Sequence, residues 1–166
     1  MRIIILGVGN ILLSDEGIGV HAANALAASY NLPPEVEVID GGTSAMDCVD
    51  AIASADLLVI ADAMRGGRAP GVITRLEGGD LQAFFRTKIS PHQVGLCDVL
   101  ATLLIHGLEP KRTVLIGIEP KSFALGLEPT PALAARIPAM IDALVAELAS
   151  AGVELTPSQP IAAAAQ

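Results

Sequence analysis

Near its start the chain reads Ile3-Ile4-Ile5-Leu6-Gly7-Val8, an unbroken apolar run that leads into the turn Gly9-Asn10. A continuous run rich in β-branched residues is typical of a strand that is buried on both faces, as in a parallel sheet. A helix can begin at a cap around Ser14-Asp15 and continue to about Ser29. The first thirty residues therefore predict a buried strand followed by a helix.

The same alternation continues along the rest of the chain. A short apolar run at residues 72–76 follows too brief a connection for a parallel crossover, so we expect this strand to pair antiparallel at a sheet edge. Pro138 should kink or restart the last helix. Further strands are predicted at 35–39, 57–61 and 113–118, a helix of about ten residues after the turn at 40–44, and longer helices at 94–106 and 130–149.

These elements predict an α/β fold, a single-domain three-layer sandwich. Its mostly parallel twisted sheet should have about five strands, one of them antiparallel, with helices on both faces. We expect the domain to span residues 1–156. Residues 157–166, rich in Pro and Ala and without a hydrophobic period, should form a mobile tail.

The composition indicates one compact globular domain, since 52% of the 166 residues are hydrophobic and only 17% are charged. The formal net charge of −8 argues against a nucleic-acid partner, because phosphate binding needs clustered Lys and Arg. No apolar stretch reaches the roughly 18 residues of a spanning helix, so we expect no membrane insertion. Cys48 and Cys97 are isolated, which fits buried thiols in a reducing cytoplasm.

Three side chains that can bind metal lie beside predicted elements of the sheet. Glu16 follows the first strand and its turn, Asp62 closes the apolar run at 57–61, and His92 lies in the loop before a predicted helix. Ligands of an open α/β sheet bind outside the carboxyl ends of its strands, where these three side chains would meet. Two carboxylates and one imidazole suit a divalent metal with open coordination positions.

Each of these residues also has a simpler explanation. Glu16 can stabilise the start of a helix, Asp62 can be a polar residue at a strand end, and His92 can be an exposed loop imidazole. An early Gly-x-Gly invites a dinucleotide-binding interpretation, but Leu12 stands where that fingerprint needs a third glycine. The pattern alone leaves a metal site and ordinary structural roles both open.

Five sequence blocks follow one another in an order typical of one enzyme family. The first reads Gly7-Val8-Gly9-Asn10-Ile11-Leu12-Leu13-Ser14-Asp15-Glu16-Gly17-Ile18-Gly19-Val20-His21. The others are Asp40-Gly41-Gly42-Thr43, Ala61-Asp62-Ala63, Ser90-Pro91-His92-Gln93-Val94-Gly95-Leu96 and Ile116-Gly117-Ile118-Glu119-Pro120. Together they resemble the hydrogenase maturation endopeptidases, and the likeness extends from residue 3 to about residue 150.

The resemblance implies an endopeptidase that removes a C-terminal extension from the large-subunit precursor of a [NiFe] hydrogenase once nickel is inserted. It implies that Glu16, Asp62 and His92 contact Ni²⁺ carried by that precursor, although Zn²⁺ or another divalent ion would suit the same ligands. Asp40 is a further catalytic candidate beside the carboxylates of Glu16 and Asp62. The same block supplies candidate substrate-binding residues, Gly41, Gly42 and Thr43.

Two positions depart from the family pattern. Glu119 stands where Gln is common, which adds an acid near the carboxyl edge of the sheet and would alter contacts with the substrate. Pro91 precedes His92 and should stiffen its approach to the site.

Glycines at positions 7, 9 and 17 are expected to leave room for a peptide beside the site. Two alternative functions remain open. One is a non-catalytic nickel-dependent docking or chaperone module, and the other is a related peptidase on the same fold, such as a relative of the spore germination proteases.

Overall fold

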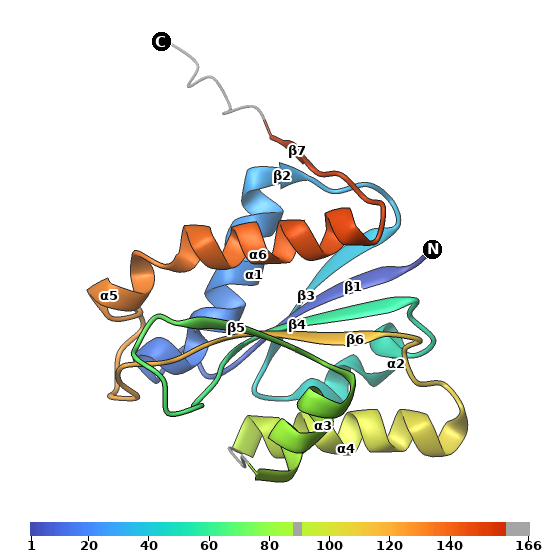
Figure 1. The fold of residues 1–166 in the computed structure, drawn as a ribbon, viewed down its shortest axis with the longest axis horizontal. Coiled ribbons are helices and arrows are strands. Elements are labelled where there is room, and N and C mark those ends of the chain that lie inside the picture. Colours follow the sequence, from blue (N-terminus) through green and yellow to red (C-terminus); the bar gives the residue numbers. More distant parts are fainter. Residues whose placement is uncertain (88–90, 159–166) are drawn as a thin grey trace.

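The computed structural model describes residues 1–87 and 91–158, along which helices and strands alternate (Figure 1). The strands are β1 (Ile3–Val8), β2 (Tyr30–Asn31), β3 (Val36–Gly42), β4 (Leu57–Ala63), β5 (Ile73–Glu77), β6 (Thr113–Ile118) and β7 (Thr156–Pro157). The α-helices are α1 (Ile18–Ser29), α2 (Val49–Ile52), α3 (Gly78–Thr87), α4 (Pro91–His106), α5 (Pro131–Ala134) and α6 (Ile137–Ser150), and the 3-10 turns are η1 (Ser14–Gly17) and η2 (Ala45–Cys48).

Five of the strands form one sheet in the order β3-β1-β4-β6-β5. β1 pairs in parallel with β3 on one side and with β4 on the other, and β4 pairs in parallel with β6. β5 lies at the edge and runs antiparallel to β6. The predicted sheet of about five strands with one antiparallel partner is therefore confirmed.

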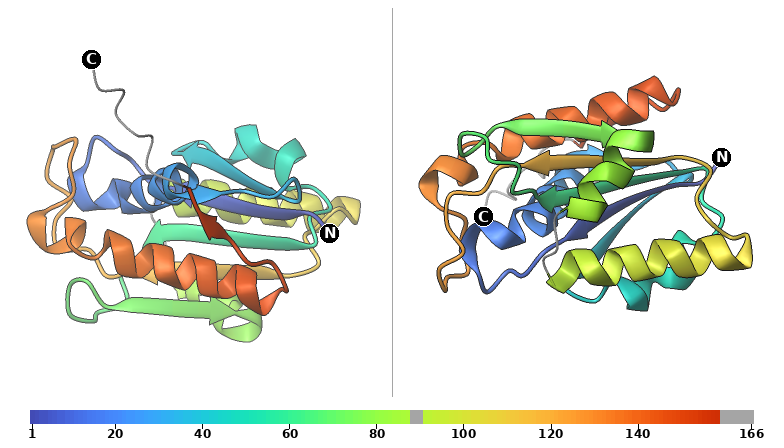
Figure 2. Two further views of the ribbon diagram at one scale, coloured as in Figure 1. Left: turned by 90° about the horizontal axis from the view of Figure 1, so that it is seen from above. Right: turned by 60° about the horizontal axis from the view of Figure 1, so that its bottom comes forward.

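Helices cover both faces of this sheet, so the fold is a three-layer sandwich (Figure 2). α1 and α6 pack on one face, while α3, α4 and the short α2 pack on the other. Successive residues of a strand point to opposite faces, and so Ile5 belongs to the first core and Leu6 to the second. β1 and β4 are buried along their whole lengths, which explains their continuous apolar sequences.

Two element boundaries near the candidate site differ from the prediction. α4 begins at Pro91, so the backbone of His92 lies in the first turn of a helix rather than in a loop. Pro fits there because the first turn does not use its missing N–H. β4 continues past the apolar run because β6 continues beside it, and Asp62 pairs with Gly117 inside the strand.

The helix after β1 also begins later than expected. Ser14 has φ of +50°, a left-handed conformation that cannot start an α-helix, so a 3-10 turn precedes α1. The predicted ten-residue helix after residue 44 consists of η2 and α2. Pro138 lies in the first turn of α6 and separates that helix from α5, which confirms the predicted restart. Among the described helices, none is long and apolar enough to cross a bilayer.

Packing at the far end of the chain extends beyond the predicted domain boundary. β7 pairs antiparallel with β2, and the N–H of Ser158 donates to the carbonyl oxygen of Ser29 at 2.9 Å. The packed part therefore reaches two residues past position 156. The rest of the predicted tail, 159–166, lies outside the described residues.

A network of ion pairs joins the edge of the sheet to α6. Arg75 on β5 contacts both Glu77 and Glu147, and Arg112 contacts the same two carboxylates, all at 2.6–2.7 Å. Hydrogen bonds from Arg112 and Arg75 lower the pKa of Glu77 to about 2. The Arg75 guanidinium likewise holds the pKa of Glu147 below its usual value. Both carboxylates are therefore ionised throughout the neutral range.

Candidate active site at the carboxyl edge of the sheet

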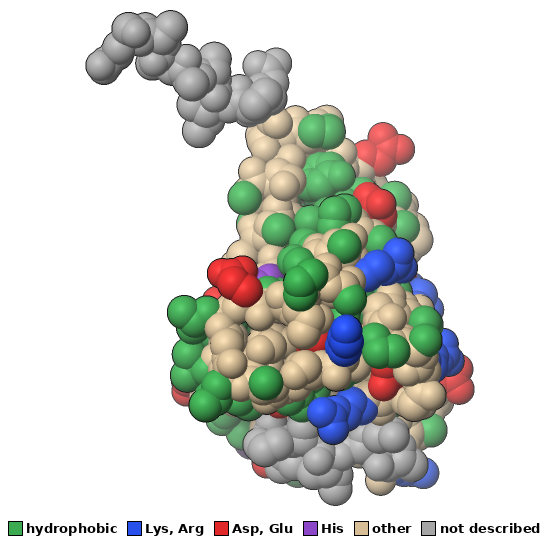
Figure 3. Space-filling view, turned by 90° about the vertical axis from the view of Figure 1, so that its left-hand side faces the viewer, with side chains coloured by type: hydrophobic (Ala, Val, Ile, Leu, Met, Phe, Trp, Pro, Cys, Tyr) green, Lys and Arg blue, Asp and Glu red, His purple; other side chains and the backbone are tan. Residues whose placement is uncertain are grey.

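The carboxyl ends of β1 and β4 mark the place where the strand order reverses. From β1 the chain passes first to β3 on one side and later to β4 on the other side. The crossovers leave such a point in opposite directions and open a crevice between them, which is where α/β folds bind ligands. Figure 3 shows the molecule viewed from this edge.

Two glycines allow η1 and the start of α1 to lie directly on these strand ends. A Cβ at Gly9 would come within 1.9 Å of the carbonyl oxygen of Glu16, and a Cβ at Gly19 within 2.1 Å of the carbonyl oxygen of Ala61. Gly9 also has φ of +129°, which favours glycine. This close approach places Glu16 over the junction of β1 and β4.

The glycines at 7, 9 and 17 therefore act differently from the expectation. A Cβ at Gly7 would lie 2.8 Å from Cβ of Ala23, and one at Gly17 would lie 2.7 Å from Cα of Ile11. At each of these glycines an added Cβ would collide with a neighbouring segment of this protein rather than project into open space. They let η1 and α1 pack closely on β1, and only Gly9 among them also lines a pocket near Asp40.

Asp62 points from β4 toward α4. It is 1% exposed, and its Oδ2 accepts a hydrogen bond of 3.2 Å from Nε2 of Gln93, which is also buried. Gln93 lies in the first turn of α4, whose amide dipoles favour a nearby carboxylate. The structure therefore joins the third and fourth sequence blocks through one buried contact.

Glu16 is the second buried carboxylate at this junction. It is 6% exposed and belongs to η1, which packs against β4. His92 directly precedes Gln93 in α4, but its side chain lies outside the described residues, so the complete three-ligand set stays a prediction. Within the described part of the chain, no three His, Cys, Asp or Glu side chains are grouped closely enough to hold a metal ion.

Asp40 lies two strands away from Asp62 and points to the opposite face of the sheet. It pairs with Gly7, which is also the partner of Ala61, the residue before Asp62. Asp40 Oδ2 accepts a hydrogen bond from Nδ2 of Asn24 on α1 at 3.4 Å. Because neighbouring residues of a strand point to opposite faces, the structure does not bring Asp40 and Asp62 together on one face.

A pocket of about 290 Å³ nevertheless links the Asp40 block to the loop before η1. It is lined by residues 9–12 and by Asp40, Gly42 and Thr43. The Asp40 side chain is exposed, and its Oδ1 accepts the N–H of Gly42 at 3.0 Å, which holds the turn. Gly41 is buried, and a Cβ there would lie 2.8 Å from Cδ1 of Leu6, so it packs against the core instead.

Asp15 is a buried acid whose role cannot be read from the sequence. Its carboxylate accepts the backbone N–H groups of Lys121, Ser122 and Thr130, and the hydroxyl of Thr130, at 2.6–3.1 Å. These donors come from the loop that follows β6, more than a hundred residues away. Asp15 therefore fixes that loop onto η1, next to Glu16.

Glu119 has a similar structural role on the neighbouring loop. It is buried, and its carboxylate accepts the N–H groups of Gly66, Gly67 and Arg68 at 2.7, 3.3 and 3.1 Å. The sequence predicts an acid that alters substrate contacts, whereas this acid faces the loop between β4 and β5. The departure from Gln thus serves to hold a loop of the same chain.

The two cysteines do not form a nucleophilic site. Cys48 is buried and Cys97 is half-buried, and burial raises the pKa of each thiol above its usual value. A raised pKa leaves little of the reactive thiolate at neutral pH. The expectation of a buried thiol is confirmed for Cys48, whereas Cys97 is only half-buried.

Proteins named for hydrogenase maturation or formation match this chain along most of its length. A family model described as hydrogenase maturation protease matches residues 20–147. The hydrogenase 2 maturation protease of Escherichia coli K12 is 44% identical over 97% of this chain and 99% of its own length. The hydrogenase expression/formation protein HupD of Rhodobacter capsulatus is 36% identical over 93% of this chain and 75% of its own.

Solved structures give the same result. The hydrogenase maturating endopeptidase HybD from Escherichia coli superimposes with a TM-score of 0.90 at 44% identity, over 95% of this chain and 98% of that one. The [NiFe] hydrogenase maturation protease HybD from Thermococcus kodakarensis superimposes with a TM-score of 0.73 at 27% identity, over 87% and 97%. The five sequence blocks, the fold and these relatives agree, and the chain belongs to the hydrogenase maturation protease family.

Proposed function

We propose that this enzyme removes the C-terminal extension of a [NiFe] hydrogenase large-subunit precursor after nickel has been inserted. The observation that supports this best is the pair of buried carboxylates, Glu16 and Asp62, at the switch point beside the first turn of α4. Membership of the family supplies the protease chemistry and the link to hydrogenase maturation.

In this proposal nickel enters the site as part of the precursor, and Glu16, Asp62 and His92 contact it. Two buried carboxylates at one strand junction can compensate the charge of a divalent ion that enters the site. Oxygen and imidazole donors suit Ni²⁺, and Zn²⁺ would also fit them. A site without thiolates holds such ions weakly, which suits a metal that arrives already bound to another protein.

The peptide bond would be hydrolysed by acidic side chains of the enzyme. Hydrolysis needs a base that takes a proton from water and an acid that protonates the departing amine. Glu16 or Asp62 is the proposed base, and it would pass the proton taken from water to the departing amine. The Gln93 amide fixes the orientation of Asp62. Nickel bound to the precursor supplies the positive charge that keeps nearby carboxylates ionised.

Asp40 would act from the pocket beside this site. Its exposed carboxylate, with Gly42 and Thr43, lines the pocket that we assign to the peptide. An Asp40→Asn variant should therefore cleave the loaded precursor more slowly while binding it nearly as well. Equal losses of cleavage and of binding would instead assign Asp40 a docking role.

The two alternative functions are not favoured. The matched relatives and solved structures carry the names of hydrogenase maturation proteases and endopeptidases, which disfavours a non-catalytic docking module and a spore germination protease relative. We place the enzyme in the cytoplasm, because two isolated cysteines without a disulfide fit a reducing compartment.

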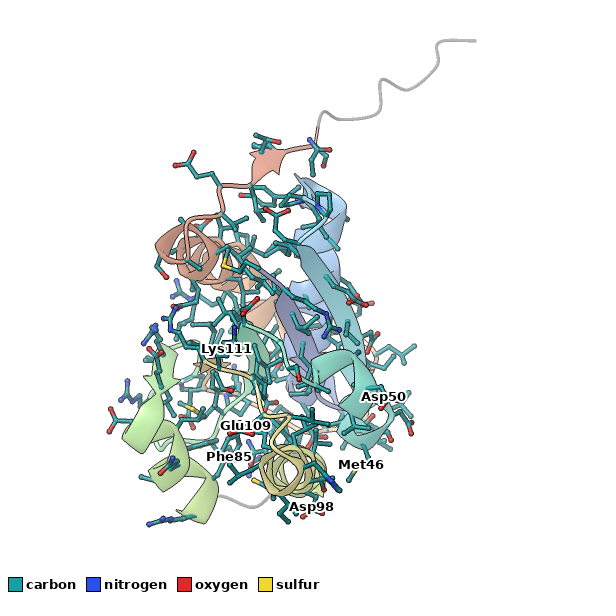
Figure 4. The ribbon with its side chains drawn as sticks, turned by 90° about the vertical axis from the view of Figure 1, so that its right-hand side faces the viewer. Met46, Asp50, Phe85, Asp98, Glu109 and Lys111 are labelled. Atoms are coloured by element: carbon teal, nitrogen blue, oxygen red, sulfur yellow. The ribbon has the colours of Figure 1, made fainter. Side chains whose placement is uncertain are left out.

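The direct test uses variants that keep side-chain shape. Glu16→Gln, Asp62→Asn and His92→Ala should each slow cleavage of a nickel-loaded precursor by about 100-fold or more, as measured by intact mass over time. Asp50→Asn, an exposed acid on α2 (Figure 4), is the matched control and should cleave at the wild-type rate. Wild-type rates in Glu16→Gln or Asp62→Asn, with an unchanged circular dichroism spectrum, would rule out this site.

A further inference from the structure

Four basic side chains stand on neighbouring loops at the carboxyl edge, although the whole chain carries a net charge of −8. Arg65 and Arg68 lie between β4 and β5, Lys121 follows β6, and Arg136 directly precedes α6. All four are exposed, and Figure 3 shows Lys and Arg side chains on this face of the molecule. These four residues are called the cationic rim below.

Contacts between the loops hold the cationic rim together. The guanidinium of Arg65 lies 4.1 Å from the ring centroid of Phe123, so the loop before β5 touches the loop after β6. Nε of Arg136 donates to the carbonyl oxygen of Gly71 at 3.1 Å. The Glu119 carboxylate fixes the loop that carries the two arginines. The rim is thus a built surface rather than a set of unrelated side chains.

The charges of the cationic rim are not neutralised by this chain. Across residues 1–87 and 91–158, none of the four takes part in an ion pair with an acidic side chain, whereas Arg75, Lys111 and Arg112 all do. Two acids lie on the same loops. Glu119 is buried and its carboxylate accepts hydrogen bonds from backbone N–H groups, while Glu128 is exposed and has no ion pair within the described residues. The rim can therefore offer its charge to a partner.

We propose that the cationic rim binds an acidic segment of the large-subunit precursor and seats the precursor over the crevice. The proposal rests on the proposed function, which makes that precursor the partner. The overall charge of −8 would repel a long polyanion such as nucleic acid. A short acidic segment is small enough to contact the cationic rim without lying against the acidic remainder of the surface. Complementary charge of this kind speeds association and fixes orientation.

Exposed leucines beside the rim favour a protein segment over a small anion. Leu125 and Leu127, on the same loop as Lys121, are 86% and 63% exposed. The N–H of Gly126 between them donates to the carbonyl oxygen of Leu12, which lines the pocket beside Asp40. A protein partner would cover both the apolar side chains and the neighbouring charges.

The test compares charge reversals at the two ends of the sheet. Arg68→Glu and Lys121→Glu change exposed side chains that take part in no hydrogen bond or ion pair within residues 1–87 and 91–158, so the fold should persist. Lys111→Glu makes the same change of charge at the opposite end of the sheet (Figure 4). There Lys111 pairs with the half-buried Asp56. KM and kcat for the nickel-loaded precursor, and the affinity of each variant for it, are measured at low and at physiological salt.

The Arg68→Glu/Lys121→Glu double variant should raise KM about tenfold at low salt and bind the precursor correspondingly more weakly, with kcat nearly unchanged. It should also lose most of the salt dependence of wild-type binding. If the wild-type enzyme cleaves the precursor, an unchanged KM in the double variant would contradict the proposal. An equal rise of KM in Lys111→Glu would contradict it as well. A wild-type enzyme that fails to cleave would refute the proposed function instead, and the binding measurement would still decide the role of the rim.

Discussion

Acidic residues at the carboxyl edge differ in the partners that they bind. Asp15 and Glu119 accept hydrogen bonds from backbone N–H groups of distant loops, whereas Asp62 accepts one from the side chain of Gln93. The first two acids hold loops in place. Asp62 and the buried Glu16 are the acids that we assign to the reaction.

The sequence places Glu16 and Asp62 at the carboxyl edge because strand ends in a parallel sheet meet at one edge, and both side chains are buried. It could not predict the direction of Asp40, because its face depends on the register with β1. The role of Glu119 was also hidden, since its partners lie more than fifty residues earlier in the chain. No local pattern connects such residues.

Gly9 should be among the positions least tolerant of a side chain. A Cβ there meets the carbonyl oxygen of Glu16, so Gly9→Ala should displace η1, reduce cleavage strongly and lower the free energy of unfolding by about 2–4 kcal/mol. Gly152→Ala is the control, because Gly152 also has positive φ but nothing lies near its Cβ. It should cost only about 1 kcal/mol and leave cleavage intact. Equal costs in urea unfolding for both variants would show that the steric contact at Gly9 is unimportant.

At the scale of elements, the hydrophobic period of the sequence predicts the buried strands and the long helices. β1 and β6 lie where the sequence predicts them, and α4 differs from its prediction only at its start. α3 was not predicted, because Gly78-Gly79 reads as a break and its helix depends on packing Leu81 and Phe84 against the core. β2 and β7 are two residues each and form a separate two-stranded pair in the described part of the chain. Elements that depend on tertiary contact carry little signal of their own.

The loop after β6 depends on Asp15 for its position. In Asp15→Asn, the amide NH2 must face backbone N–H donors on one side, because both carboxylate oxygens accept hydrogen bonds from this loop. We expect a loss of about 2–4 kcal/mol in the free energy of unfolding and faster hydrogen exchange at residues 121–126. Asp50→Asn, at an exposed position, should change neither quantity. Unchanged exchange in Asp15→Asn would mean that the loop is held by its other contacts.

Across the whole molecule, the two ends of the sheet carry different arrangements of charge. At the carboxyl edge the basic side chains of the cationic rim are unpaired within the described residues, whereas Lys111 and Arg112, at the start of β6, are paired with acids. Although the chain has a net charge of −8, four of its basic side chains therefore stand beside the candidate site without an ion pair in the described residues.

The ion-pair network of the sheet edge should make the fold sensitive to acid. The pKa of Glu77 is about 2 in the folded protein against an ordinary value of 4.5, so its contribution to stability is present above pH 4.5 and is lost as the pH falls toward 2. The partners are partly exposed, which reduces the loss to about 1–2 kcal/mol. Glu77→Gln should be less stable at neutral pH, and its stability, measured by urea unfolding, should change less between pH 5 and pH 2 than that of the wild type. A curve as steep as that of the wild type would assign the acid sensitivity to other groups.

The central claim is that the crevice recognises nickel already held by the precursor. The most direct measurement incubates the wild-type enzyme with nickel-loaded and with nickel-free large-subunit precursor and follows the intact mass of each. We predict loss of the C-terminal extension from the loaded precursor alone, and no loss from either form with Asp62→Asn. Cleavage of the nickel-free precursor at the same rate would contradict the claim.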